Sequence, residues 1–404
     1  MDINIDSEIG KLQGVILHKP GKELERMTPE TIQEALYSDI LNSHIAGEEY
    51  AFFEGVLQKS ARVFYVEDLL IGILKNTALK ERMIDTVCGM HNAEFLKDEL
   101  CSLTPEALAD IFISGYEKKG DFSGSRYPIP PLYNFFFTRD ASVSLHNEVL
   151  VNRMRHPVRD REAYLMDMIF QHAFNANTFR LQGDSTLHVE GRDLLVARED
   201  VLLVGNGSRT SKSAIEALVQ KAKGEKRLQY IVVQELPEKP DSFIHLDMVF
   251  TFLDKNACMC YKPIIAKESA YHTTIITIEG EKVQYTEKPT LLQALQELHF
   301  DLQPICCGDP ADEWNQQREQ WHSGANFFAM APGQIIGYER NQHTIGQLAK
   351  AGFEVIPAKS VVQGKVQMDP DHRYVVTLSG SELPRGGGGA RCMTMPVYRE
   401  KVIW

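Results

Sequence analysis

The sequence has no excess of positive charge and no long apolar run. Its 404 residues carry 43 Lys and Arg against 55 Asp and Glu, a net charge of −12. Binding nucleic acid or an anionic membrane without sequence preference needs surplus cations, so this balance disfavours both partners. No apolar stretch is long enough for a membrane span, and the first residues lack the basic and apolar regions of a secretory signal.

The cysteines show no disulfide or zinc pattern. There are seven, an odd number, at irregular spacing. No second pair has zinc-like spacing, and no nucleotide-binding glycine motif or His-rich metal motif is present. Such a set is typical of a reducing compartment, where most cysteines are small buried hydrophobes. We therefore expect a cytoplasmic protein without a bound metal.

A strand, an amphipathic helix and a second strand recur along the chain. The first strands of five copies are predicted near residues 14, 149, 201, 282 and 333. The clearest copy has a strand over 201–204, a helix whose apolar residues include Ile215 and Leu218, and a strand over 230–233. Two of the intervals are about 50 residues, which is typical of a repeat architecture.

The first interval is much longer than the others. Its excess, residues 67–122, is predicted as helices at 69–84, 93–100 and 107–113, and Pro105 suits the first turn of the last. The sequence therefore predicts an α/β chain of five units over residues 1–66 and 123–404, interrupted by a helical insertion at 67–122.

One cysteine lies beside an unusual loop. Cys392 follows four consecutive glycines, Gly386 to Gly389, which let backbone approach a ligand closely. The adjacent Arg391 could lower the pKa of the thiol and make it reactive. A flexible turn before a strand with a buried cysteine explains the same residues, and the pattern alone leaves both interpretations open.

Paired acids and histidine form further candidates. His245 and Asp247 alternate and would face one side of a strand, where they suit acid–base work, although a buried structural His is the more frequent explanation. Glu190 and Asp193 flank a glycine, and Asp140 ends an aromatic segment.

Two arginines stand near predicted helix starts. The helix dipole does not favour a cation at Arg159 or Arg209, which hints at binding of an anion such as a carboxylate. Solvated surface arginines are the alternative.

In order and spacing, these segments resemble the arginine deiminase family, among the guanidino-group modifying enzymes, over nearly the whole chain. The matching segments are Ser7–Leu12, Phe137–Asp140, Glu190–Asp193, Gly207–Ser211, His245–Thr251, Arg318–Trp321, Ala331–Gly333 and Arg391–Pro396.

The resemblance implies a five-bladed α/β propeller (pentein) of pseudo-fivefold ββαβ units, with a helical insertion after the first unit. It also implies hydrolysis of free L-arginine to L-citrulline and ammonia, without a cofactor, through a covalent cysteine S-alkylthiouronium. The implied partners are L-arginine and water, and a homo-oligomer, dimer or higher, is implied as well.

The resemblance also assigns site residues. Five match the family's catalytic positions: Cys392, His245, Asp140, Asp247 and Glu190. Four more are carried over as substrate-binding: Asn134, Arg159, Arg209 and Asp193. Cys392 would attack the guanidinium carbon, while Asp140 and Asp247 would grip the guanidinium nitrogens. His245 would protonate the leaving nitrogen and then activate water, and the two arginines would clamp the α-carboxylate.

Three positions depart from the family pattern. Arg192 replaces the second of two glycines, and would strain the loop if the position needs a positive φ. Met248 stands where a Thr is common, and the glycines before Cys392 are not interrupted by an arginine. Gating of the substrate could therefore pass to Arg385 or Arg391.

Other functions are compatible with the same residues. The scaffold could hydrolyse arginine further to ornithine as a dihydrolase, or transfer the amidino group to an amine. A non-catalytic arginine sensor is disfavoured by the intact set of Cys392, His245 and Asp247. A thiol protease would leave the extra carboxylates and the two arginines without a role.

Overall fold

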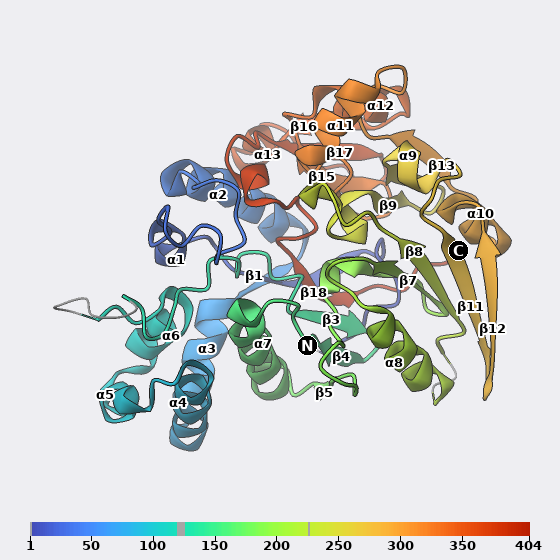
Figure 1. The fold of residues 1–404 in the computed structure, drawn as a ribbon. Coiled ribbons are helices and arrows are strands. Elements are labelled where there is room, and N and C mark those ends of the chain that lie inside the picture. Colours follow the sequence, from blue (N-terminus) through green and yellow to red (C-terminus); the bar gives the residue numbers. More distant parts are fainter. Residues whose placement is uncertain (1, 119–125, 225–226) are drawn as a thin grey trace.

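Five β-sheets with flanking helices make up the fold of the residues that the structure describes (Figure 1). A computed structural model describes residues 2–118, 126–224 and 227–404. In each sheet of the described residues, two strands pair antiparallel and the second of them pairs in parallel with a third. This repeated order matches the ββαβ unit that the resemblance implied, whereas the sequence pattern alone predicted only the two parallel strands and the helix between them.

The first three sheets follow the predicted spacing. The first has the order β18 (Met395–Arg399), β1 (Leu12–Leu17) and β2 (Arg62–Tyr65), with α1 (Lys22–Glu25) and α2 (Ser43–Ser60) between β1 and β2. The second has the order β3 (Ser142–Leu145), β4 (Glu148–Val151) and β5 (Asn177–Phe179), with α7 (Asp160–Ala173) before β5. The third is built on β6 (Leu194–Arg198), β7 (Val201–Asn206) and β8 (Tyr230–Glu235), with α8 (Lys212–Lys223) before β8.

Helix α8 shows why the third unit was predictable. The Ser211 hydroxyl caps the helix by accepting the N–H of Ala214 at 3.2 Å. Ile215, Leu218 and Val219 share one buried face at helical spacing. A capped start and a continuous apolar stripe are the local signals of an amphipathic helix packed on a sheet.

The fourth unit differs from its prediction. Strand β12 (Lys282–Lys288) does not open this unit; it forms a hairpin with β11 (Thr273–Glu279) that extends the third sheet. The fourth sheet instead joins β9 (Phe250–Asp254), β10 (Ala257–Cys260) and β13 (Gln303–Cys306). The sequence rule failed here because β10 spans only four residues and lacks a helix directly after it long enough to show a period.

The fifth sheet contains the two predicted strands, β15 (Gln334–Tyr338) and β16 (Glu354–Pro357), and two more. Its order is β14 (Phe328–Ala331), β15, β17 (Tyr374–Leu378) and β16. Strand β17 inserts between the two predicted strands. The remaining helices of the fourth and fifth units are α9 (Lys262–Ile265), α10 (Leu291–Glu297), α11 (Glu313–Trp321), α12 (Gln342–Lys350) and α13 (Ala358–Val362).

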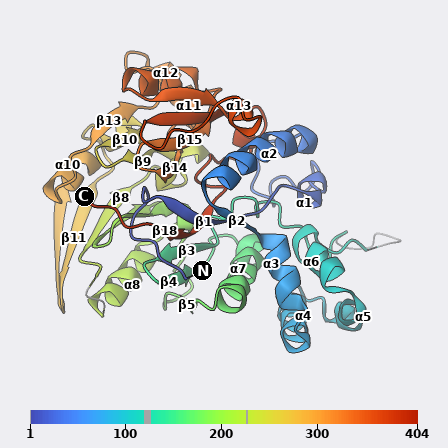
Figure 2. The same cartoon turned by 180° about the vertical axis from the view of Figure 1, so that it is seen from behind.

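Four α-helices lie between β2 and β3 in the described part of this stretch. They are α3 (Val66–Leu74), α4 (Thr77–His91), α5 (Lys97–Ser102) and α6 (Pro105–Ser114). The single helix predicted over 69–84 is two, because Asn76 ends the first and caps the second through the N–H of Leu79. In Figures 1 and 2 the four helices gather at one side of the molecule, opposite the β11–β12 hairpin.

The structure describes only part of the boundary of the predicted insertion. Residues 119–122 of the insertion, and 123–125 of the predicted connection back to the sheets, lie outside the described residues. The division into two domains stays a prediction. Among the helices that the structure describes, none is long and apolar enough to cross a membrane.

Neighbouring sheets touch in a continuous series. β18 contacts β3, β1 contacts β14, and β14 contacts β9. The third sheet meets the second and fourth through turns, since the N–H of Gly191 donates to the Asp140 carbonyl at 3.0 Å and the turn at 191–193 contacts that at 246–248. Strand β18, near the C-terminus, pairs with β1, near the N-terminus, so the series closes on itself.

Candidate active site

A polar residue of the site lies just before the first strand of each unit. Asp140 lies just before β3, Glu190 just before the turn that leads into β6, and Cys392 just before β18. His245 and Asp247 precede β9. Equivalent ends of five related sheets face one another, so side chains far apart in the sequence meet at one place.

The segment around His245 is not the strand that alternation suggested. It is a 3₁₀ turn over Leu246–Met248 that precedes β9. Asp193 holds this turn, because its Oδ1 accepts the N–H of Leu246 at 2.9 Å while its Oδ2 accepts the Thr210 hydroxyl at 2.6 Å. Burial raises the pKa of Asp193 well above its usual range. Asp193 therefore fixes the turn that carries Asp247, and its assignment to the substrate stays a prediction.

The predicted nucleophile is buried and protonated. The Cys392 thiol donates to Asp247 Oδ2 at 3.5 Å and accepts the N–H of Gly389 at 3.3 Å. Burial raises the pKa of Cys392 well above the ordinary thiol value, and the nearby Arg192 cation opposes that rise. The cation that acts on the thiol is Arg192 rather than Arg391, on which the sequence argument relied.

His245 is paired with Glu190. Its Nε2 lies 2.9 Å from Glu190 Oε2 and 3.8 Å from Asp140 Oδ1. Burial of Glu190 is outweighed by Arg209 and His245, which lower the pKa of this carboxylate. An ionised carboxylate only accepts hydrogen bonds, so Nε2 of the ring carries the proton. Burial, together with Arg192, lowers the pKa of His245, and its Nδ1 is a buried acceptor without a partner.

Arg192 reaches toward both predicted guanidinium-binding aspartates. Its Nε lies 3.3 Å from Asp247 Oδ1 and 3.8 Å from Asp140 Oδ1, and Nη2 donates to the Gly387 carbonyl at 3.1 Å. The guanidinium carbon lies 5.7 Å from the centre of the Phe137 ring. The side chain is only 3% exposed.

The loop that carries Arg192 is unstrained. Arg192 is not among the residues with a positive φ. The backbone strain that a positive φ would cause at this position is therefore absent. The preceding Gly191 is required for another reason: a Cβ there would lie 2.0 Å from the Arg139 carbonyl oxygen. Glycine at 191 is needed for close packing, whereas position 192 accepts a long side chain.

Arg391 serves the site through buried ion pairs. Its Nε and Nη2 donate to Glu8 at 2.8 and 3.0 Å, and Nη1 donates to Asp247 Oδ2 at 3.0 Å. Burial of Glu8 is outweighed by Arg391, which lowers the pKa of Glu8 to about 2. This network fixes Asp247 beside the thiol.

Two residues of this network were not predicted. Glu8 lies in a segment that carried the resemblance, but nothing in its sequence neighbourhood links it to a site 383 positions away. Asn326 accepts the N–H of Arg391 and donates to the Asp247 carbonyl, both at 3.0 Å. An isolated asparagine carries no local signal, although its position just before β14 is equivalent to that of the other site residues.

The predicted carboxylate clamp lines a cavity of about 840 Å³. Asn134, Arg159, Arg209, Asp140, Arg192 and His245 are among its lining residues. Arg159 is already committed: Nη1 donates to Asp140 at 2.7 Å and Nη2 to Glu162 at 2.7 Å. Arg209 is freer, with side-chain exposure of 12% and contacts of 3.4 Å to both Glu190 oxygens. Asn134 donates its amide to the Ala35 carbonyl at 2.7 Å.

The glycine segment forms part of the cavity wall. Gly387 has a φ of +83° and offers its carbonyl to Arg192. A Cβ on Gly388 would lie 2.4 Å from the Phe137 ring, so the backbone packs directly on that ring. The suggested gate Arg385 pairs with Asp39 and, at 2.7 Å, with Glu382. The guanidinium that reaches toward both site aspartates is instead that of Arg192.

One group among the described residues could offer ligands to a metal ion. One atom each of Asp140, Glu190 and His245 lies within 4.8 Å of the others. Arg159 and Arg209 contact the same carboxylates, and their positive charges oppose a cation there. The absence of a metal stays a prediction.

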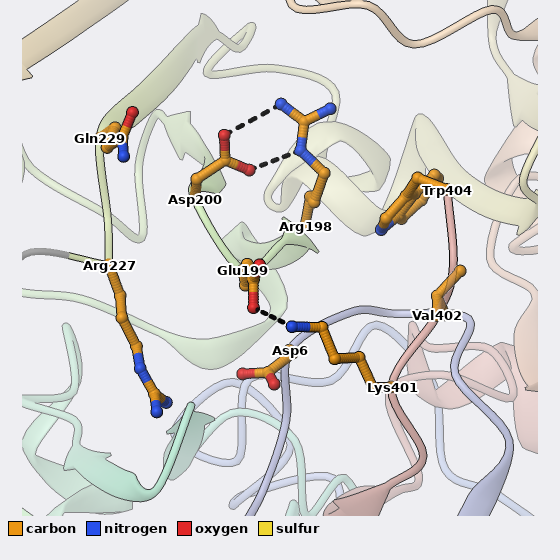
Figure 3. Close-up of a pocket in the computed structure, with 9 residues that line it drawn as sticks. All are labelled: Asp6, Arg198, Glu199, Asp200, Arg227, Gln229, Lys401, Val402 and Trp404. Atoms are coloured by element: carbon orange, nitrogen blue, oxygen red, sulfur yellow. Dashed lines mark hydrogen bonds and ion pairs between the residues drawn. The ribbon is translucent and has the colours of Figure 1, made fainter.

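A second hollow, of about 540 Å³, holds none of these residues (Figure 3). Four of its charged side chains form two local pairs. Arg198 contacts Asp200 at 2.5 Å and Lys401 contacts Glu199 at 2.7 Å, while Trp404 closes one side. The predicted site residues therefore belong to the cavity that His245 lines and not to this second hollow.

Solved structures of guanidino-modifying enzymes share the fold. An amidinotransferase from Microseira wollei is 13% identical with a TM-score of 0.55, covering 100% of this chain and 98% of that one. DDAH from Pseudomonas aeruginosa is 13% identical with a TM-score of 0.53, covering 96% of this chain and 99% of that one. The chain thus has the pentein fold that the resemblance implied.

Sequence comparison identifies the family. The arginine deiminase of Bacillus cereus (strain B4264) is 31% identical, with 99% of each chain covered. That of Listeria monocytogenes serotype 4a (strain HCC23) is also 31% identical, over 99% of this chain and 98% of the relative. The family described as arginine deiminase matches residues 116–399. The chain therefore belongs to the arginine deiminase family.

Proposed function

We propose that this protein hydrolyses free L-arginine to L-citrulline and ammonia, with Cys392 as the nucleophile. The observation that carries the proposal is the position of the Arg192 guanidinium. It lies beside Asp247 and near Asp140, close enough to Cys392 to act on the thiol. The carboxylates therefore accommodate a guanidinium group next to a thiol, which is the arrangement that deimination needs.

The first half of the reaction forms a thiouronium. Asp140 and Asp247 hold the substrate guanidinium by charge-assisted hydrogen bonds. The sulfur of Cys392 attacks the central carbon, and the thiol proton passes through His245 to the leaving nitrogen. A C–S bond forms and a C–N bond breaks, so ammonia leaves and the cationic S-alkylthiouronium stays on the enzyme. The unpartnered Nδ1 of His245 is the atom that can carry this proton.

The second half regenerates the thiol. His245 takes a proton from water, whose oxygen attacks the thiouronium carbon. The C–S bond breaks, the sulfur is reprotonated, and the carbonyl of citrulline remains. The proton released in this half is taken up by ammonia, so the sum is arginine cation plus water to citrulline plus ammonium. Asp247, fixed by Arg391, keeps the reacting cation in place throughout.

A product assay tests the proposal. We expect citrulline and ammonia in equal amounts from wild type with L-arginine, and neither from Cys392→Ala. Cys101→Ala is the matched control, because Cys101 is exposed and outside the site, and it keeps full activity. Ornithine without citrulline would instead assign the dihydrolase or amidinotransferase reaction. Folded wild type that binds arginine without turnover would overturn the proposal in favour of a sensor.

The family resemblance also supports a homo-oligomer acting in the cytoplasm. Light scattering of the purified protein checks the mass of the assembly, and fractionation of the cells that make it checks the compartment. A monomer, or recovery with the membrane fraction, would contradict these two points without touching the reaction.

A further inference from the structure

The buried aspartates of the site are partly neutralised by the chain itself. Asp140 and Asp247 are both fully buried, and Arg192 Nε lies 3.8 and 3.3 Å from them. Each aspartate also has a cation on its other oxygen, Arg159 on Asp140 and Arg391 on Asp247. Arg192 is a third cation, placed near the Oδ1 atoms of both aspartates, where it supplies in the free protein the positive charge that the substrate brings when it binds.

The same guanidinium fills space that the substrate needs. Arg192 is 3% exposed, packs over Phe137, and raises no strain in its own backbone. Asp140 Oδ1 lies beside it as a buried acceptor with no hydrogen-bond partner. A substrate guanidinium that pairs with both aspartates would satisfy this orphan oxygen, but it cannot do so while the Arg192 side chain stays between them.

We propose that Arg192 is an internal guanidinium that occupies the substrate position and sets the affinity for guanidinium compounds by competing with them. The proposal rests on the function proposed above, because it takes Asp140 and Asp247 as the guanidinium site. Exchange of one guanidinium for another conserves the charge of the site. The substrate gains only the difference between its contacts and those of Arg192.

The glycine segment is coupled to this exchange. Arg192 Nη2 donates to the Gly387 carbonyl at 3.1 Å, and the next carbonyl, Gly388, accepts the Tyr338 hydroxyl at 3.1 Å. When Arg192 leaves, Gly387 loses its donor while Gly388 stays anchored. Departure of Arg192 thus loosens the wall at the residue with the positive φ and opens the cavity from that point.

Direct binding tests the competition. Calorimetry on Cys392→Ala, which cannot convert arginine, measures the Kd of methylguanidinium. This probe lacks the α-carboxylate and so forms no ion pair with Arg159 or Arg209. If Arg192 fills the site in nine of ten molecules, its removal tightens binding about tenfold. We expect that gain in Cys392→Ala/Arg192→Gln, the same gain for L-arginine, and none in Cys392→Ala/Arg198→Gln, which alters an arginine of the other hollow. Equal or weaker binding after Arg192→Gln would overturn the proposal.

Turnover separates this role from one in the chemistry. In the otherwise wild-type protein, Arg192→Gln is expected to lower KM for arginine about tenfold, with a much smaller change in kcat. A fall in kcat with KM unchanged would make Arg192 a participant in the reaction and overturn the competition. The binding ratio above does not depend on citrulline formation, so failure of the proposed function and failure of this inference are distinguishable.

A structure provides a test that does not require Arg192→Gln to fold. In a crystal of Cys392→Ala soaked with L-arginine, Arg192 should have left Asp247, and the ligand should contact both aspartates. A bound guanidinium on Asp247 and Asp140 with Arg192 still in its present place would contradict the proposal.

Discussion

The thiol of Cys392 and the carboxylate of Asp247 are hydrogen-bond partners, with Sγ 3.5 Å from Oδ2. A negative neighbour disfavours a thiolate, and burial raises the pKa of Cys392 further. The cysteine is therefore a neutral thiol in the free protein at neutral pH, and its deprotonation belongs to the reaction with the bound cation.

Alkylation of the thiol tests this protonation state. A thiol whose pKa is raised stays protonated until the pH exceeds that pKa. In a Cys101→Ala background, we expect inactivation by iodoacetamide to be slow at neutral pH and to keep rising into the alkaline range. A rate that is already at its plateau at neutral pH would show a preformed thiolate and contradict this assignment.

The pair of Glu190 and His245 makes a prediction for the pH profile. Glu190 favours the charged ring, so Glu190→Gln should lower the pKa of His245 below its already lowered value. Reaction with a neutral thiol needs the neutral ring, so the acid limb of kcat/KM should move to lower pH in this variant. A limb that moves to higher pH would exclude His245 as the titrating group.

Removing His245 should affect the chemistry more than binding. His245→Gln deletes the proton carrier while keeping a polar side chain, so we expect kcat to fall by about 10² to 10⁴ with a smaller change in KM. Steady-state kinetics on the folded variant measures both. A kcat within a few-fold of wild type would mean that another group transfers the proton.

The two clamp arginines should behave differently. Arg209 is the one with exposure to the cavity, and losing a charge-assisted hydrogen bond to the α-carboxylate of the substrate raises KM by about tenfold to a hundredfold. Arg209→Gln should thus raise KM for arginine but not for agmatine, which has no carboxylate. Arg159→Gln should impair both, because Arg159 holds Asp140. Equal losses for both substrates in Arg209→Gln would refute the clamp.

The buried pair of Glu8 and Arg391 makes a prediction for stability. The pKa of Glu8 is lowered from an ordinary value of 4.5 to about 2. A carboxyl group whose pKa is lowered by folding stabilises the folded state at a pH above its unfolded pKa. This stabilisation is lost as the pH falls through the window from the unfolded pKa to the folded pKa. The shift corresponds to about 3 kcal/mol, and breaking a buried pair costs a similar amount.

Urea unfolding measures this contribution. Glu8→Gln should lower the free energy of unfolding at neutral pH by about 3 kcal/mol, and the difference from wild type should shrink as the pH falls through the window. Glu199→Gln is the control, because it breaks only the exposed pair with Lys401 and should have little effect. A difference that does not change with pH would show that Glu8 acts by packing alone.

Local sequence patterns predicted the parts of the fold that local physics determines. Helix α8 carries its own cap and apolar stripe, and the strands on both sides of it are nearly continuous apolar runs. Strand β12 was assigned to the wrong unit because its strand signal is real but says nothing about which sheet it joins. Strand partners are set by long-range packing, which a single sequence does not display.

The site shows the same division. Cys392, His245, Asp140, Asp247 and Glu190 were identified as a set through their matched segments, and the structure brings them together. The place of Arg192 against Asp247, 55 positions away, could not be predicted, because the sequence showed only that a glycine was missing. Likewise the hydrogen bond from the Leu246 N–H to Asp193 could not be predicted, because the two residues are 53 positions apart.

Mass spectrometry of the enzyme during turnover tests the central claim most directly. Wild type mixed with L-arginine and quenched in acid should carry a covalent adduct with the mass of arginine less ammonia, and digestion should locate it on the peptide that contains Cys392. The adduct should be absent from Cys392→Ala and should disappear from wild type when the substrate is exhausted. Citrulline formation with no adduct on Cys392, or an adduct on another cysteine, would contradict the account.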